Sequence, residues 1–162
     1  MNIITLDLSI VNTGYCIFTK EGKFVISGSI PTKPKFETQL RLRNIYSNLR
    51  DLFYKYDPKI VLIERGFSRH NKSTQTLFKV HGVANLAFYK CKQIEYAPNH
   101  IKSVAGNDGK MKKEDLRRLL EHIFDLEFEN EDESDAFAIG ITYFKNNGMR
   151  MEDILDAQER DV

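Results

Sequence analysis

Apolar and polar positions divide the first thirty residues into short segments with the character of β-strands. Runs of β-favouring residues separated by turn residues predict three strands, over residues 3–8, 15–19 and 24–30. The intervening turns, Asn12-Thr13-Gly14 and Glu21-Gly22-Lys23, are short and rich in turn-forming residues. This part of the chain therefore predicts a β-meander.

Beyond residue 36, apolar residues recur at spacings of three and four, which is typical of amphipathic helices. Helices are expected over residues 37–56, 72–91, 99–106, 113–124 and 132–145. Between them, a short β-branched run predicts a strand over residues 59–64, and a second short strand is expected over residues 94–97, before Pro98. Hairpin strands followed by alternating helices and strands predict an α/β domain with a mixed five-stranded sheet, three antiparallel strands first and parallel strands after, flanked by helices.

Length and composition favour one soluble, folded unit. The chain has 162 residues, of which 41% are hydrophobic and 29% charged, values typical of a single globular domain. We expect residues 1–148 to form this domain and residues 149–162, acidic and weakly patterned, to form a loosely held acidic tail. No signal peptide or apolar membrane span is expected, and the two cysteines show no disulfide or metal spacing, which predicts a cytoplasmic protein.

The net charge of +1 hides a strong segregation of charge along the chain. Residues 65–113 contain ten basic and two acidic residues, whereas residues 114–162 contain five basic and fifteen acidic residues. The basic part predicts a surface for a polyanion such as nucleic acid, although a solvated face would have the same composition. The acidic part predicts either a cation site or a solvated tail.

Four acidic residues stand out by their positions. Asp7 lies among apolar residues near the end of the first strand, Glu64 ends the fourth strand, and Asp132 and Asp135 share one side of a helix start. Taken singly, each could orient a turn, cap a helix or decorate the surface. Taken together, with the first and fourth strands as neighbours, they predict a site for hard cations such as Mg²⁺ or Mn²⁺. Two such ions about 3.5–4 Å apart support hydrolysis of a phosphodiester.

The segments LDLSIVNTGY, VLIERGF and NEDESDAFAIG, in this order and at this spacing, resemble the RuvC family of Holliday junction resolvases, which belongs to the RNase H-like superfamily. The resemblance covers residues 2–146. It implies an RNase H-like fold, a homodimer and a nuclease that uses two Mg²⁺ or Mn²⁺ ions per active site. Such an enzyme nicks four-way junctions, and here other branched DNA as well, in recombination and repair, leaving 5′-phosphate and 3′-hydroxyl ends. The implied catalytic metal ligands are Asp7, Glu64, Asp132 and Asp135.

The resemblance also implies contacts with DNA. Phe67 matches an aromatic residue that enters among the bases at the junction centre, although a core position would fit it equally well. Lys102 and Lys113 match two lysines near the scissile phosphate; Lys113 is the expected catalytic lysine, and Lys112 replaces it if the loop register shifts by one. The other expected DNA-binding residues are Arg65, Arg69, Asn71, Lys72 and Lys110.

The helix over residues 72–91 resembles the dimerisation helix of the family. Its small residues Gly82, Ala84 and Ala87 allow close approach of a second helix, but they equally suit packing on the sheet. The chain departs from the family in its DLS start, where a DPG-type start is usual, and in its acidic tail. Compact, divergent members occur in phages and large viruses, and for such an origin the host cytoplasm is the expected location.

Two other classes of function are compatible with parts of the pattern. A catalytically silent module could bind branched DNA through the basic segment, with the carboxylates serving only the fold. An ATPase of the actin or sugar-kinase type also begins with an aspartate and a glycine-bearing hairpin, but such enzymes need two domains and a longer chain.

Overall fold

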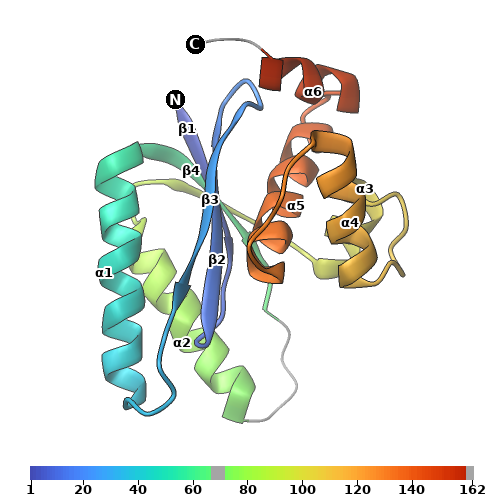
Figure 1. Ribbon diagram of the computed structural model, residues 1–162. Helices are drawn as coiled ribbons and strands as arrows, with labels where there is room; N and C mark the ends of the chain where they lie inside the picture. Colours follow the sequence, from blue (N-terminus) through green and yellow to red (C-terminus); the bar gives the residue numbers. More distant parts are fainter. Residues whose placement is uncertain (67–71, 160–162) are drawn as a thin grey trace.

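The computed structural model describes residues 1–66 and 72–159, which form one β-sheet with helices on both faces (Figure 1). Across the sheet the strands follow the order β3-β2-β1-β4-β5. The strands are β1 (Asn2–Asp7), β2 (Asn12–Thr19), β3 (Phe24–Pro31), β4 (Pro58–Glu64) and β5 (Lys92–Tyr96). The helices are α1 (Thr38–Tyr56), α2 (Lys72–Ala87), α3 (Pro98–Ala105), α4 (Lys113–Phe124), α5 (Glu131–Asn146) and α6 (Met151–Glu159).

Strand β1 lies at the centre of the sheet and joins its antiparallel and parallel halves. It pairs antiparallel with β2 and parallel with β4. Outside these, β3 pairs antiparallel with β2, and β5 pairs parallel with β4. Antiparallel neighbours need only short turns, whereas parallel neighbours need a crossover, which α2 provides between β4 and β5. The expected mixed five-stranded sheet is confirmed, and so is the expected pairing of the first and fourth strands.

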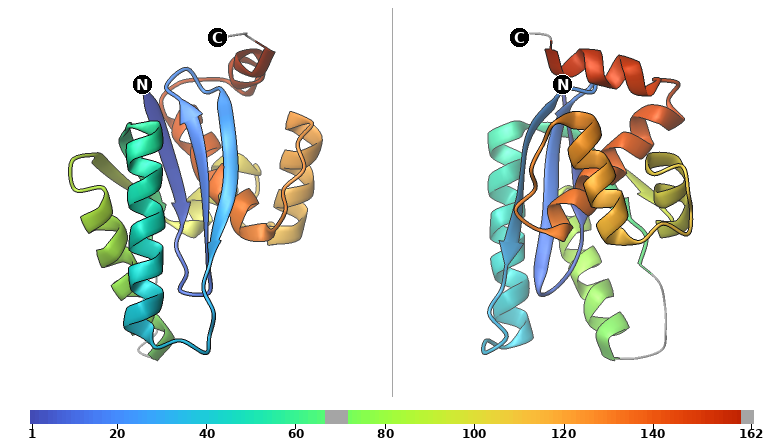
Figure 2. Two further views of the ribbon diagram at one scale, coloured as in Figure 1. Left: turned by 60° about the vertical axis from the view of Figure 1, so that its left-hand side comes forward. Right: turned by 45° about the vertical axis from the view of Figure 1, so that its right-hand side comes forward.

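The alternation of side chains along β1 supplies two hydrophobic clusters, one on each face of the sheet. Ile4 and Leu6 belong to the cluster beneath α1 and α2, whereas Ile3 belongs to the cluster with α3, α4 and α5. Figure 2 shows α1 and α2 on one side of the sheet and α3, α4 and α5 on the other. Because both faces are covered, β1 is buried except at its two ends.

Helix α5 packs directly on the strands and is buried over residues 133–142. Gly140 faces the ring of Phe18 on β2, and a Cβ added at this glycine would lie 2.4 Å from the ring. The hydroxyl of Thr5 on β1 donates a hydrogen bond of 2.6 Å to the carbonyl of Ala136. These contacts define where the helix lies along both strands.

Two bounds differ from the sequence prediction by three residues or more. Strand β2 begins at Asn12 instead of residue 15, because Asn12 and Gly14 pair with β3 and thus belong to the ladder. Helix α2 ends at Ala87 instead of residue 91, since the chain leaves the helix in a turn closed by a hydrogen bond from Cys91 N to Phe88 O.

The expectation of a loosely held tail is wrong for residues 151–159, which form α6. Ile154 and Ala157, three residues apart, are buried together, and the acidic residues take the opposite face. Gln158 also accepts a hydrogen bond of 2.8 Å from the Phe24 amide. Gly148, with φ of 88°, allows the chain to turn back after α5, so α6 reaches the β2–β3 end of the sheet.

Within residues 1–66 and 72–159, no helix combines the length and the apolar character that crossing a membrane would require.

Replacement of Gly140 by alanine tests the close packing of α5 on the sheet. The new methyl group would overlap the Phe18 ring, and overpacking of this kind costs about 1–3 kcal/mol, which exceeds the gain of about 1 kcal/mol in helix propensity. We therefore expect Gly140→Ala to lower the free energy of unfolding measured by denaturant titration. Gly109→Ala, in the loop before α4, is the control, because a Cβ added there would meet only ordinary van der Waals contacts at 3.5 Å and beyond, and it should be neutral or stabilising. Equal effects of the two variants would contradict the packing argument.

Candidate active site

Two of the four carboxylates meet because β1 and β4 are parallel neighbours that end at the same edge. Leu6 pairs with Ile63, so the next residues, Asp7 and Glu64, leave the sheet side by side. Asp7 follows Thr5 at the two-residue period of a strand, and Thr5 points at α5. On β4, Leu62 belongs to the hydrophobic cluster on the α5 side, and Glu64, two residues further along, faces the same side. Both carboxylates therefore lie on the α5 face of the sheet.

The other two carboxylates lie in the first turns of α5, which begins over the same edge. The helix is capped by Asn130, whose side chain accepts a hydrogen bond of 3.1 Å from Glu133 N, so Asp132 is not the cap. On β2, Gly14 pairs with Asp7, and a Cβ added at Gly14 would lie 2.0 Å from the carbonyl oxygen of Asp132. The absence of a side chain at Gly14 thus allows the start of α5 to approach the end of β1.

Burial and the neighbouring carboxylates both shift the ionisation of Asp7. Burial, together with the nearby negative charges of Asp135, Glu64 and Asp132, raises the pKa of Asp7 to about 8. Burial also raises the pKa of Glu64 and of Asp135 above their usual ranges, with nearby lysine charges opposing both shifts. Carboxylates that are buried together and shift one another upward form a site with a deficit of positive charge.

Lys113, the first residue of α4, supplies one positive charge to this cluster. Its Nζ donates a hydrogen bond to Asp135 Oδ2; the lysine side chain is 53% exposed and that of the aspartate 10%. Partial burial alone would lower the pKa of Lys113, but the bond to Asp135 and the charges of Asp7 and Glu64 outweigh it, and the pKa is raised. Lys102 on α3 acts on Glu64, because its charge lowers the pKa of that carboxyl.

The two lysines next to Lys113 lie outside this contact. Lys112 occupies the N-cap position of α4 and is exposed, and Lys110 is exposed in the preceding loop, where its backbone N–H donates to Asp108 Oδ1. Of the two alternatives that the sequence left open for the catalytic lysine, Lys113 is the one in contact with a carboxylate of the cluster.

Arg65 follows Glu64 and is held at its backbone, where its N–H donates to the Tyr96 carbonyl at 2.8 Å. Its exposed side chain faces Glu95 at 3.8 Å. The sequence-predicted DNA contacts Phe67, Arg69 and Asn71 fall outside the described residues, and the structure describes the backbone but not the side chain of Lys72.

The sequence analysis missed Asn12 as a site residue. Its Nδ2 donates a hydrogen bond of 2.7 Å to Asp132 Oδ2, across 120 positions of the chain. The sequence indicated only turn-forming chemistry at Asn12, and no local pattern distinguishes an asparagine that shapes a turn from one that contacts a distant carboxylate. Only the packing of α5 on β2 brings the two side chains together.

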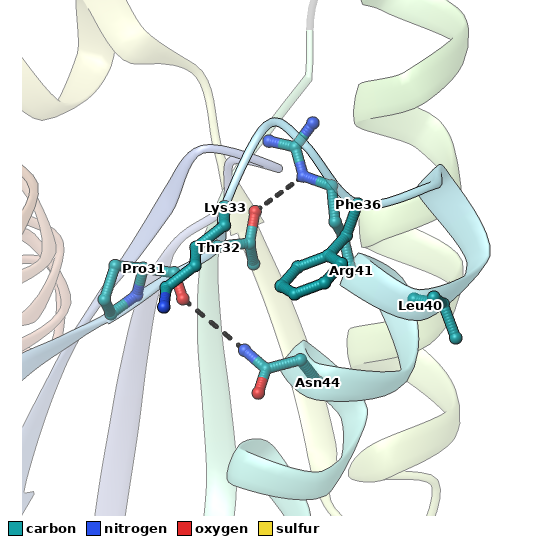
Figure 3. A pocket seen from close by; sticks show the side chains of 7 residues that line it. All are labelled: Pro31, Thr32, Lys33, Phe36, Leu40, Arg41 and Asn44. Carbon is teal, nitrogen blue, oxygen red and sulfur yellow. Dashed lines mark hydrogen bonds between the residues drawn. The ribbon is translucent and has the colours of Figure 1, made fainter.

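The loop before Asn12 is held from the side of α1. The guanidinium of Arg41 donates to the Ile10 carbonyl at 3.0 Å and to Thr32 Oγ1 at 2.7 Å, and the Thr32 hydroxyl donates to the same carbonyl. Figure 3 shows the bond between Arg41 and Thr32 at a surface pocket formed where β3 leads into α1. This pocket contains none of the four carboxylates, so it is separate from the cluster.

In the described part of the chain, no three or more His, Cys, Asp or Glu side chains are already placed to hold a metal ion. Instead, the Lys113 ammonium contacts Asp135 among the carboxylates. The four carboxylates are thus gathered on neighbouring elements without their oxygens converging on one point.

Comparison with known proteins identifies the group to which this arrangement belongs. The family described as "Crossover junction endodeoxyribonuclease RuvC" matches residues 3–143. A protein of that name from Rickettsia typhi is 31% identical over 151 residues, which cover 88% of this chain and 96% of the relative. One from Caldanaerobacter subterraneus subsp. tengcongensis is 28% identical over 157 residues, covering 92% of this chain and 95% of the relative.

Solved structures agree with the fold. The RuvC structure from Thermus thermophilus superimposes with a TM-score of 0.77 at 19% sequence identity, covering 91% of this chain and 97% of that chain. Its complex with a Holliday junction substrate gives the same TM-score at 20% identity, with 88% of this chain and 92% of that chain covered. The expected RNase H-like α/β fold is confirmed. Because the family match spans nearly the whole sheet and most of α5, and so includes all four carboxylates, this chain belongs to the RuvC family of crossover junction endodeoxyribonucleases.

Proposed function

We propose that this protein is a metal-dependent, structure-selective endodeoxyribonuclease that nicks Holliday junctions and other branched DNA, leaving 5′-phosphate and 3′-hydroxyl ends. The observation that carries the proposal is the gathering of Asp7, Glu64, Asp132 and Asp135 at one edge of the sheet, with Lys113 in contact with them. Membership of the RuvC family supports both the reaction and the branched substrate.

The donor set of the cluster fits a hard divalent cation such as Mg²⁺ or Mn²⁺. Carboxylate oxygens are the ligands that these ions prefer, and Asp7 lies among three other carboxylates whose negative charges, added to burial, raise its pKa to about 8. We assign Asp7, Glu64, Asp132 and Asp135 as the residues that hold two such ions. Divalent ions bound there would polarise the phosphate and make water more acidic, which is the chemistry that phosphodiester hydrolysis requires.

The chain's own groups have separate tasks in this proposal. The carboxylates would hold the cations in place. The dense packing of α5 on the sheet excludes bulk water from the side of the carboxylates that faces the sheet. The half-exposed Lys113 reaches both Asp135 and the solvent, so its ammonium can stabilise charge that develops on a phosphate. Lys102 is the second lysine of the cluster, acting from the side of Glu64.

Contacts with the rest of the DNA involve exposed basic residues near the cluster. Arg65 follows Glu64 directly, and Lys110 and Lys112 lie in the loop that ends at Lys113, so all of them can bind phosphates close to the scissile one. Phe67, Arg69, Asn71 and Lys72 remain predicted contacts, with Phe67 stacking on a base.

We further propose that the protein acts as a homodimer through α2. Phe78 and Leu86, on the exposed side of α2, expose 48% and 61% of their surfaces, and Tyr89, in the turn that follows the helix, exposes 63%. Large apolar side chains grouped on one exposed helix face favour burial against a partner. A twofold dimer would present two sites to opposite arms of a four-way junction.

The decisive experiment compares a labelled immobile four-way junction with a linear duplex of matching sequence, in Mg²⁺, in Mn²⁺ and in EDTA. We expect paired nicks on opposing strands of the junction, only with a divalent metal. Equal cleavage of the linear duplex would contradict structure selectivity. Binding without cleavage in both metals would show a silent branched-DNA-binding module instead.

Asp7→Asn should abolish nicking while junction binding is retained, because the substitution removes a carboxylate oxygen and leaves the basic surface unchanged. We expect the cleavage rate to fall by more than roughly 100-fold, beyond the 10–100-fold loss typical of residues that only support a metal ligand. Asp51→Asn, on the exposed side of α1, is the control and should cleave normally. Normal cleavage by Asp7→Asn would show that the site assignment is wrong.

The same substitution should stabilise the protein in EDTA. Because the folded-state pKa of Asp7 is about 8 and its ordinary value is 3.8, the folded protein favours the neutral carboxyl, and stability falls as the pH rises from about 4 to 8. Asp7→Asn lacks this loss, so its Tm should exceed that of the wild type by a growing margin up to pH 8. A change of about 1 kcal/mol corresponds to roughly 2–4 °C in a domain of about this size. A lower Tm for the variant at pH 8 would contradict the charge argument.

A further inference from the structure

Asn12 makes one strong contact at the carboxylate cluster and leaves its other polar atom without a partner. Its Nδ2 donates to Asp132 Oδ2 at 2.7 Å. Among the buried side-chain nitrogen and oxygen atoms of the described residues, Asn12 Oδ1 is the one that has no hydrogen-bond partner. Leaving such an acceptor unpaired costs about 1–3 kcal/mol. A buried acceptor that is left unpaired at this cost suggests that the Asn12 side chain serves a function at the cluster.

The charge of Asp132 explains why the amide keeps this orientation. If the amide were reversed, Asn12 Oδ1 would face Asp132 Oδ2, and two acceptors would repel each other. The carboxylate therefore selects the donor end of the amide and leaves Oδ1 unpaired. The bond to a charged acceptor is of the stronger kind, which offsets the cost at Oδ1.

The backbone that carries Asn12 is firmly held. The Thr13 hydroxyl, fully buried, donates to Ser9 O at 2.7 Å and accepts from Ser9 N at 3.2 Å, which closes the turn before β2. Thr32 N donates to Val11 O at 2.9 Å, and Arg41 holds the neighbouring carbonyl. The Asn12 amide is thus presented from a rigid support.

Asp132 needs such a support more than Asp135 does. It is only partly buried, so its side chain has the freedom to turn away from the like charge of Asp7. Asp135, by contrast, is held by Lys113. A carboxylate that turns toward solvent must be reordered before it can bind a cation, and this ordering weakens the affinity.

We propose that Asn12 is a positioning residue that holds the Asp132 carboxylate in the orientation required to bind a divalent cation. This inference rests on the proposed metal-dependent function. Loss of the amide should weaken metal binding while leaving the fold and the reaction at saturating metal nearly unchanged. The role concerns affinity for the cation, not the chemical step.

The test compares the wild type with Asn12→Leu, which keeps a similar shape but removes the amide, and Asn12→Gln, which keeps a donor. Metal binding is measured without DNA, as the rise in Tm during a titration with Mn²⁺ after removal of metal by EDTA. Nicking of a four-way junction is measured as a function of Mg²⁺ concentration. Asn44→Ala, which removes an exposed asparagine whose side chain donates to the Pro31 carbonyl at the end of β3, is the control.

We expect Asn12→Leu to raise the half-saturating metal concentration about 10-fold in both assays, with a metal-free Tm close to that of the wild type and a rate at saturating metal within about twofold. Asn12→Gln should recover part of the affinity, and Asn44→Ala should match the wild type. An unchanged half-saturating concentration in Asn12→Leu would overturn the inference. So would a loss of Tm and of maximal rate without a change in metal affinity, which would indicate a purely structural role.

The two proposals fail in different ways. If Mn²⁺ does not raise the Tm of the wild-type protein, the metal-dependent function itself is contradicted. If the wild type responds to Mn²⁺ and Asn12→Leu responds identically, only the role of Asn12 is contradicted.

Discussion

The close approach of α5 to β1 and β2 is the constraint on which the rest of the structure depends. Gly14 and Gly140 leave the space for it, the hydroxyl of Thr5 bonds to the helix backbone, and the thiol of Cys16 contacts the Glu133 carbonyl at 3.4 Å. The two glycines let the backbones approach closely, and the Thr5 and Cys16 side chains bond directly to the helix backbone, so the helix has little freedom to shift. Its first turns are therefore held over the ends of β1 and β4, where the carboxylates lie.

This approach brings like charges together and so works against stability. In the absence of a cation, the carboxylates raise one another's pKa values, and Lys113 offsets the repulsion only in part. The start of a helix favours negative charge, which helps α5 to tolerate its acidic first turns. A site that is unfavourable when empty gains free energy when a cation binds, so in the proposed function the same clustering would provide the driving force for metal binding.

The fold brings residues from the acidic and the basic parts of the chain together at the carboxylate cluster. The acidic last third supplies the partly buried Asp132 and the buried Asp135 at the carboxylate cluster, and it also supplies the exposed acidic residues of α6. The basic middle third supplies the lysines around the cluster, Lys102 from α3 and Lys113 from α4. The net charge near zero thus conceals an acidic centre bordered by basic residues, an arrangement that suits a nuclease whose metal ions and polyanionic substrate must meet.

The sequence by itself indicated the order of β1–β5 and α1–α5 and singled out the four carboxylates as candidates, because periodicity and the ends of strands are local properties. The adjacency of β1 and β4 entered the sequence analysis as a premise, and the structure shows it. The tertiary structure decided what depends on contacts between distant segments. It selected Lys113 over Lys112 for the contact with Asp135, replaced a loose tail by α6, and joined Asn12 to Asp132. Such contacts leave no local pattern, since they arise from where α5 rests on the sheet, and a shift of one helical turn would have chosen different partners.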